Sequence, residues 1–316
     1  MPEVITVGET MAAMVPYEYG SLRYVYNFRL KAGGAESNVA VGLSKLHHSS
    51  GWISRLGDDE LGYTVRNALR AEGVDMTQVI WDKKHNTGMM VKQTNHNQET
   101  KVIYYRKGSA ASYLNVNDLN QNYLRSAKVI HMSGILPVLS QSCMDVANFI
   151  FDFAEKNNIM ISFDPNIRKK VWGDTDYSGV LKEMCLKSDI VMLGKEEAET
   201  LFGVNDPKTT KEICFEEGKT KYFAFKAGGK GAWVSDGGEL INIPPYPCTV
   251  VDPVGAGDGF DAGFISGILE GKPIDVCGKM GGIVGAKATE TRGDMEGYPR
   301  RSELDDILYN HEIVYR

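Results

Sequence analysis

Cysteines and long apolar runs are scarce in this chain of 316 residues, and basic residues do not outnumber acidic ones. The five cysteines are an odd number and include no C-x-x-C pair, so neither a disulfide framework nor a zinc site is indicated. We expect free, buried thiols in a reducing cytoplasm. The 35 Lys and Arg against 41 Asp and Glu give a net charge of −6, which argues against a general nucleic-acid binder. No run approaches the roughly 18 apolar residues of a membrane span, and we expect no targeting segment or membrane association.

Two glycine signatures of nucleotide-binding proteins are also missing. The Gly-rich segment at 225–234 lacks the G-x-x-x-x-G-K-[ST] spacing of a P-loop. No G-x-G-x-x-G follows the first apolar run at Val4–Val7, which argues against a nicotinamide-dependent dehydrogenase. The composition, 42% hydrophobic and 24% charged, is that of a folded protein.

Short apolar runs alternate along the chain with longer stretches of helical periodicity. Several runs are apolar on both faces, as in a parallel sheet covered by helices. Strands are expected at Val4–Val7, Gly51–Arg55, Lys128–Met132, Ile159–Asp164, Asp189–Leu193 and Lys221–Lys226. Helices are expected at Ala35–Leu46, Glu60–Ala71, Gln141–Lys156, Glu196–Phe202, Gly257–Leu269 and near Asp275–Glu290. This alternation predicts an open α/β sheet with right-handed connections.

Two segments break the alternation. Residues 11–32 contain many aromatics and show no helical period. Residues 87–106 contain two alternating stretches around an Asn-rich turn, which is typical of a β-hairpin. We expect a small β-subdomain that covers a site at the sheet edge or pairs with a second subunit; the alternative is an insertion with neither role.

The strongest chemical signal is the run VDPVGAGDGFDAGFISGIL, which begins at Val251. Gly255 and Gly257 have no Cβ, so backbone N–H groups at the start of the following helix can approach an anion closely. A phosphoryl group that gains charge during transfer would be stabilised there. Asp258 follows at once and could accept the proton of a hydroxyl that attacks phosphorus. The alternative is that Asp258 only caps the helix and the glycines only turn the chain.

A second glycine turn, Gly33–Gly34, feeds the helix expected at 35–46. Asn38, on the first turns of that helix, either hydrogen-bonds a polyol or caps locally. Asp58 and Asp59 precede the next helix, where capping is the default interpretation.

Polar residues follow three of the expected strands. Asn166 and Arg168 stand after a strand that ends at Asp164, where ligands of open α/β sheets bind, and a guanidinium suits a carboxylate or a phosphate. Arg168 could equally be an ordinary surface residue. Glu196, Glu197 and Glu199 begin a helix, where one could hold Mg²⁺ through water or simply suit the helix dipole. The loop with Gly228, Gly229 and Gly231 is either a hairpin turn or a nucleotide contact.

Taken together, these segments resemble the ribokinase-like (PfkB) carbohydrate kinases nearly from end to end. The signature regions are GGAESNVA with RLGDDELG near the start and VDPVGAGDGFDAGF near the end. The resemblance implies a single catalytic domain over residues 1–316, a three-layer α/β/α sandwich with a small β-sheet lid formed by about 11–32 and 87–107. It implies ATP-dependent phosphotransfer to an alcohol group, with Mg²⁺.

Within the family, the chain looks most like the 2-keto-3-deoxygluconate kinases. The segments concerned are GGAESN at 33–38, YYRKGSAAS at 104–112, DPNIRKKVW at 164–172 and TRGDMEGYP at 291–299. This implies phosphorylation of the terminal hydroxyl of that sugar acid to give 2-keto-3-deoxy-6-phosphogluconate. A fructokinase or other neutral-sugar kinase of the same family is the alternative, followed by a catalytically silent sugar-binding regulator.

The resemblance assigns a role to each candidate residue. Asp258 would be the general base. The anion hole would be formed by Gly255, Ala256 and Gly257. The sugar acid would be held by Gly34, Asn38, Tyr104, Arg106, Arg168 and Asp294. The nucleotide would be contacted by Asn166, Lys226, Gly228, Gly231 and Gly282.

Two arginines and two acidic residues among these candidates are expected to bind charged groups. A 2-keto acid carries a carboxylate, for which Arg106 and Arg168 supply two guanidinium groups, and Arg106 lies on the expected hairpin, which suits a lid that excludes water. The family's Asn-x-x-Glu metal motif reads Gly194-Lys195-Glu196-Glu197 here, with Glu197 expected to act through water. Asp252 would contribute to a monovalent-cation site, such as one for K⁺.

The expected flap has two further implications. Met90 stands where relatives can place a Tyr against the sugar. Exposed apolar strands on a flap predict a homodimer or higher homo-oligomer formed through the lid.

Overall fold

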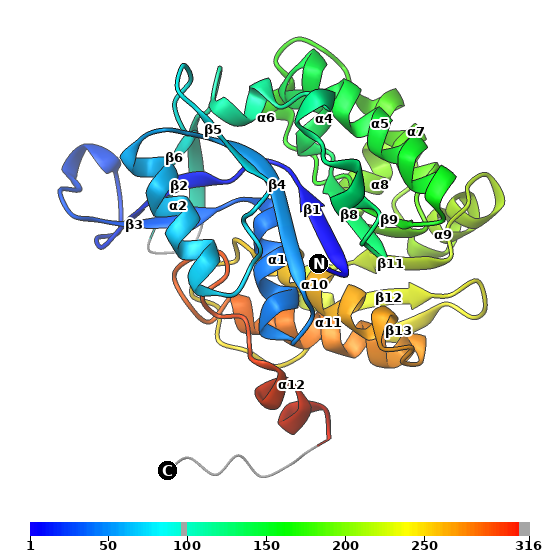
Figure 1. Ribbon diagram of the computed structural model, residues 1–316. Helices are drawn as coiled ribbons and strands as arrows, with labels where there is room; N and C mark the ends of the chain where they lie inside the picture. The colour runs from blue at the N-terminus through cyan, green and yellow to red at the C-terminus, as the bar shows by residue number, and fades with distance from the viewer. Residues whose placement is uncertain (96–99, 310–316) are drawn as a thin grey trace.

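A nine-stranded sheet runs through the computed structural model, which describes residues 1–95 and 100–309 (Figure 1). The strands are parallel from the first to the seventh below, and the last two are antiparallel additions. In spatial order they are β5 (Val79–Asp82), β4 (Ser50–Gly57), β1 (Val4–Val7), β8 (Val129–Ser133), β9 (Met160–Asp164), β10 (Ile190–Gly194), β11 (Tyr222–Lys226), β12 (Ala232–Ser235) and β13 (Ile241–Ile243). All six predicted strands are present.

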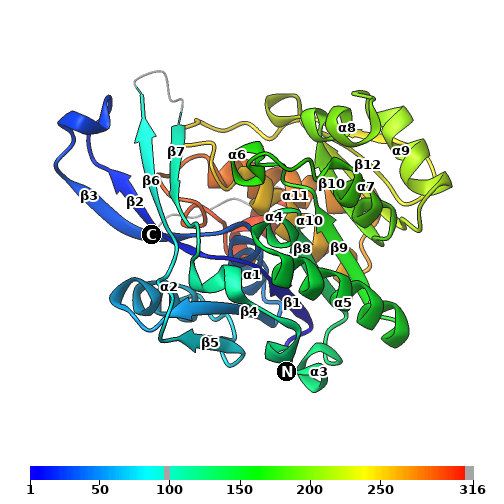
Figure 2. The same cartoon turned by 90° about the horizontal axis from the view of Figure 1, so that it is seen from above.

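Helices cover both faces of this sheet, so the predicted three-layer sandwich is confirmed (Figures 1 and 2). One layer contains α5 (Gln141–Asn157), α7 (Ser178–Leu186), α8 (Lys195–Phe202) and α9 (Pro207–Glu216). The other contains α1 (Ala35–Lys45), α2 (Glu60–Ala71), α10 (Ala256–Leu269), α11 (Ile274–Ala288) and α12 (Arg301–Leu308). Short helices are α3 (Gln121–Leu124), α4 (Ile135–Leu139) and α6 (Lys169–Trp172).

Strand β10 shows why the sheet has two apolar faces. Val191 and Leu193 point into the core beneath α5 and α8, whereas Ile190 and Met192 point into the core beneath α10. Successive side chains of a strand alternate between faces, so a strand covered on both sides must be apolar throughout. The continuous apolar runs in the sequence are therefore the interior of the sandwich. Among the described helices, none is long and apolar enough to cross a membrane.

A second, four-stranded sheet projects to one side of the sandwich (Figure 2). Its order is β3 (Phe28–Gly33), β2 (Met11–Pro16), β6 (Met89–Thr94) and β7 (Thr100–Tyr105). The strands β6 and β7 pair antiparallel, as predicted for the hairpin, and the first segment adds a second antiparallel pair. The predicted turn between β6 and β7 includes residues 96–99, which lie outside the described residues. We call this element the small sheet.

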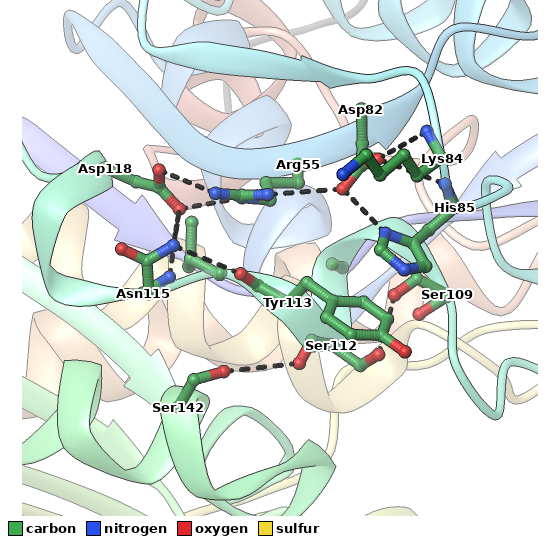
Figure 3. Close-up of polar contacts among 12 residues, drawn as sticks. Arg55, Asp82, Lys84, His85, Ser109, Ser112, Tyr113, Asn115, Asp118 and Ser142 are labelled. Atoms are coloured by element: carbon green, nitrogen blue, oxygen red, sulfur yellow. Dashed lines mark hydrogen bonds and ion pairs between the residues drawn. The ribbon is translucent and has the colours of Figure 1, made fainter.

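A polar network joins the connections before β6 and after β7 of the small sheet to the edge of the large sheet (Figure 3). Arg55 on β4 donates to both carboxylate oxygens of Asp118, at 2.7 and 2.8 Å, and to Asp82 at 3.2 Å. His85, on the connection into β6, lies 3.0 Å from Asp82 and stacks on Tyr113, on the connection out of β7. Burial would raise the pKa of Asp82, but hydrogen bonds from His85 and two backbone amides outweigh it and lower that pKa to about 2. Both connections are therefore held by charged, satisfied contacts.

Candidate active site

A cavity of about 940 Å³ lies between the carboxyl ends of the parallel strands, the start of α10 and the small sheet. Parallel α/β sheets place their ligands at this edge. Residues far apart in the sequence meet there. The predicted site residues that line it are Gly34, Asn38, Tyr104, Arg106, Asn166, Arg168, Glu197, Lys226, Gly255, Gly257, Asp258 and Asp294.

Five other predicted residues are not among the described residues that line this cavity. Ala256 is the first residue of α10, and Asp252 is buried just before that helix. Gly228 and Gly231 belong to the turn between β11 and β12, so this glycine segment is a hairpin turn, and Gly282 lies on α11. The nucleotide roles of the three glycines and the anion-hole role of Ala256 stay predictions.

Gly255 sets the conformation at the start of α10. Its φ is +88°, and an added Cβ would lie 1.9 Å from the backbone oxygen of Asp294, so both the conformation and the space require glycine. At Gly257 an added Cβ would meet only the Lys226 ammonium, at 3.7 Å. The first amides of a helix lack helical acceptors and carry the positive end of its dipole. The cavity therefore meets a helix end that is suited to an anion, and Gly257 leaves space in front of it.

Asp258 does not cap α10, because its carboxylate faces another helix. Its Oδ2 accepts a hydrogen bond from Nδ2 of Asn38 on α1, at 2.7 Å. Burial raises the pKa of Asp258 to about 6; the Asn38 bond opposes this shift, and the charge of Asp164 adds to it. A carboxylate of this pKa is charged at neutral pH and still basic enough to take a proton.

Lys226 provides a fixed cation beside the helix end. At the end of β11 its ammonium donates to Asp164 at 2.7 Å and to Asp261, on α10, at 3.0 Å. Burial alone would lower the pKa of Lys226, but these two carboxylates outweigh it and raise that pKa. Lys226 therefore stays charged while bridging two elements of the cavity wall.

Glu197 occupies the start of α8, where the metal motif was expected. Its two oxygens accept from the backbone amides of Gly194, at 2.6 Å, and Ile167, at 3.0 Å. Burial and the nearby charge of Asp164 raise the pKa of Glu197. Among the described residues no cluster of three or more His, Cys, Asp or Glu could hold a metal ion by itself. Mg²⁺ gives up its waters reluctantly. Since both oxygens of Glu197 already accept amides, Glu197 would act on an ion that arrives with a nucleotide only through the waters of that ion.

The two arginines reach the cavity from different sheets. Arg106 follows β7 and is buried, and its Nε donates to Glu9 at 2.6 Å. Arg168 follows β9 and is exposed, and its described hydrogen bond goes to the carbonyl of Ile167. Asn166 adopts φ +39° between the strand and Arg168, a conformation that Asn tolerates better than most residues. The cavity thus combines a preorganised guanidinium with a more accessible one.

A larger cavity, of about 1480 Å³, adjoins the first. It extends along α8 and the turn after β11, and it includes Ala227 and Lys230. Its lining residues shared with the first cavity are Ile167, Arg168, Lys169, Glu197 and Lys226. The two spaces therefore meet at the charged groups that follow the strands.

Glu9 and Lys92 are functional candidates that the sequence did not reveal. Glu9 is buried after β1 and pairs with Arg106. Lys92 is buried on β6 and pairs with Asp252 and Asp294. Neither belongs to a local motif, and their partners lie 97 to 202 residues away. For Lys92 the sequence offers one signal. In an alternating strand it lies on the same face as Met90, which is buried.

Comparison with known proteins identifies the family. The family described as "pfkB family carbohydrate kinase" matches residues 1–301. A 2-dehydro-3-deoxygluconokinase of Bacillus subtilis (strain 168) is 35% identical over 317 residues, covering 99% of this chain and 98% of that protein.

Solved structures of similar proteins share the fold. A PfkB protein from Polaromonas sp. JS666 is 32% identical with a TM-score of 0.87, covering 97% of this chain and 100% of the other. A protein from E. coli, solved as a putative ribokinase II in complex with ATP and Mg²⁺, is 26% identical with a TM-score of 0.90, covering 98% and 100%.

Proposed function

Since the chain belongs to the pfkB family of carbohydrate kinases, and so is an ATP-dependent sugar kinase, we propose that its substrate is 2-keto-3-deoxygluconate. The product would be 2-keto-3-deoxy-6-phosphogluconate. The observation that carries this proposal is that Arg106 and Arg168 open into the same cavity as Asp258. A sugar acid presents a carboxylate to such guanidinium groups, whereas a neutral sugar has no charge to pair with them. The full-length similarity to a 2-dehydro-3-deoxygluconokinase supports the same choice.

The proposed reaction is in-line transfer of the γ-phosphoryl group to the terminal hydroxyl. The hydroxyl oxygen forms a bond to phosphorus, the bond to the ADP oxygen breaks, and the hydroxyl proton passes to the Asp258 carboxylate. Asn38 holds that carboxylate in place at 2.7 Å. The amides at the start of α10 and the Lys226 ammonium face the negative charge that develops on the phosphoryl oxygens.

Asn38 also has a feature suited to the sugar. Its Oδ1 is buried and has no partner among the described residues. A buried acceptor without a donor is costly, so a ligand hydroxyl would relieve it. Mg²⁺, when bound with ATP near Glu197 and Asp164, would neutralise phosphate charge.

Substrate competition tests the proposal. The rate of ADP release would be measured with 2-keto-3-deoxygluconate, 2-keto-3-deoxygalactonate, fructose and ribose. We expect the highest kcat/KM with the first of these. A higher value with fructose or ribose would replace the proposal with a neutral-sugar kinase, and a higher value with the galactonate would change the stereochemistry alone. No ADP release with any sugar would favour the silent regulator.

The small sheet is proposed to act as the lid and as the surface for a second copy of this chain. Tyr104 and Arg106 bring its β7 end into the cavity, which supports closure over the substrate. Its Leu30 and Tyr105 are exposed, which supports pairing between subunits. Sedimentation analysis would give a dimer or larger assembly, and a monomer at micromolar concentration would contradict this part. The five free cysteines support a cytoplasmic location as part of the proposal.

A further inference from the structure

Lys92 is a fully buried lysine in the small sheet. Its side chain is 0% exposed, although lysine is among the residues least often buried. The ammonium donates to Oδ2 of Asp252 at 3.1 Å and to Oδ1 of Asp294 at 2.5 Å. Burial alone would lower the pKa of Lys92, but the two carboxylates outweigh it and raise that pKa. Lys92 therefore encloses an ammonium between two buried carboxylates.

Its two partners flank the helix end that binds the phosphoryl group. Asp252 precedes α10, and its Oδ1 accepts from the amide of Val254. Asp294 lies against Gly255, because a Cβ there would meet the Asp294 backbone oxygen. The ammonium thus fixes the residues on both sides of the turn at Gly255.

The monovalent-cation site suggested around Asp252 does not fit these contacts. Both oxygens of Asp252 already accept hydrogen bonds, from Lys92, Val254 and the hydroxyl of Thr100. A metal ion needs oxygen acceptors, and donors surround this carboxylate instead. The Lys92 ammonium, with three N–H donors, supplies the positive charge that a bound K⁺ would otherwise place beside these carboxylates.

We propose that Lys92 is the resident cation of this turn: a positioning residue that holds the start of α10 in its phosphoryl-binding geometry and makes turnover independent of K⁺. The inference rests on the kinase activity but not on the identity of the sugar. The assay is ADP release with whichever sugar the wild-type chain accepts. Failure of the proposed substrate is thereby distinguishable from failure of this inference.

The first test needs no variant. The kcat of the wild-type chain would be measured in KCl and in choline chloride at equal ionic strength. We expect values within about twofold of each other, because the positive charge is covalently attached. Activation by K⁺ of more than about fivefold would overturn the proposal, whatever the variants do.

The second test removes the charge. Lys92→Met keeps most of the side-chain length, and we expect kcat to fall about 10- to 100-fold while KM changes little, as small misplacements of a reactive site do. Lys92→Arg would retain most of the kcat. Lys83→Ala, at an exposed lysine between β5 and β6, is the matched control and should behave as wild type. A folded Lys92→Met with wild-type kcat would overturn the proposal.

Rescue separates charge from packing. Lys92→Ala leaves two carboxylates around an empty volume, and ammonium chloride should raise its kcat about tenfold while leaving wild type unchanged. A folded variant with low kcat and no recovery in either ammonium or K⁺ would overturn the role of the charge. Circular dichroism establishes folding, and where a variant does not fold, the comparison of KCl with choline chloride decides.

Discussion

Asn38 on α1 donates a 2.7 Å hydrogen bond to the carboxylate of Asp258 on α10. The pair joins the helix that follows Gly33–Gly34 to the helix that follows Gly255, across 220 residues. It links two helices that line the same cavity, and we propose that the N-terminus of α10 faces the phosphoryl group there. A hydrogen bond to the charged form of an acid favours that form, so Asn38 tunes the proposed base as well as placing it.

Asp258→Asn should separate catalysis from stability. We expect kcat to fall by about 10²- to 10⁴-fold while ATP binding, measured by calorimetry, is retained. Because the pKa of Asp258 is raised to about 6 in the folded protein, the charged carboxylate lowers stability above that pH. The neutral amide removes this effect, so the free energy of unfolding at pH 7.5 should rise by about 3 kcal/mol. Asp58→Asn is an exposed control, and near-normal kcat in Asp258→Asn would refute the base.

The pH dependence of turnover reports the same group. We expect kcat/KM to fall about tenfold per unit below a pKa of about 6, as the proposed base becomes protonated. Asn38→Ala removes a donor to the charged form and should move this limb about one unit toward alkaline pH. An unchanged profile in Asn38→Ala would show that another group titrates. Asn67→Ala, on the exposed surface of α2, is the control.

Arg168→Ala tests the carboxylate anchor. We expect the KM for 2-keto-3-deoxygluconate to rise about 10- to 100-fold, because a charge-assisted pair is lost, while the KM for fructose changes little. The KM of Arg168→Lys for the sugar acid should lie between the values for wild type and Arg168→Ala, since an ammonium cannot bind a carboxylate with two parallel bonds. Equal effects on the acid and the neutral sugar would remove the anchor argument.

Gly255 and Gly257, both just before Asp258, should respond differently to substitution by alanine. Gly255→Ala meets the Asp294 backbone and a φ of +88°, so we expect a loss of more than about 1 kcal/mol in thermal unfolding. Gly257→Ala meets only a lysine end at 3.7 Å, so it should fold normally and lose kcat, because its methyl group occupies the phosphoryl space. Normal kcat in a folded Gly257→Ala would place the phosphoryl group elsewhere.

Much of the sandwich could be predicted because its signals are local. The apolar runs around Val4–Val7 and Ile190–Gly194 are continuous because both faces of each strand are buried. The small sheet could be predicted only in part. Its hairpin is a local pattern, but the parallel pairing of β2 with β6 joins segments about 75 residues apart, and no local rule chooses that partner.

In the candidate site, too, residues of a local motif could be predicted and residues joined only by tertiary contacts could not. Glycines and Asp258 form a contiguous motif, so they could be predicted together. Lys92 stands in an ordinary alternating strand, and its burial depends on carboxylates 160 and 202 residues further along the chain. The pairing of Arg106 with Glu9 likewise depends on tertiary contact alone.

The contacts behind Gly255 have a consequence for synthesis. The backbone that supports this glycine belongs to Asp294, close to the end of the described chain, and the ammonium that fixes it comes from the first third. A nascent polypeptide in which Asp294 has not yet been synthesised lacks this contact. The turn at Gly255 therefore gains its support only after residues through Asp294 have been synthesised and have folded against it.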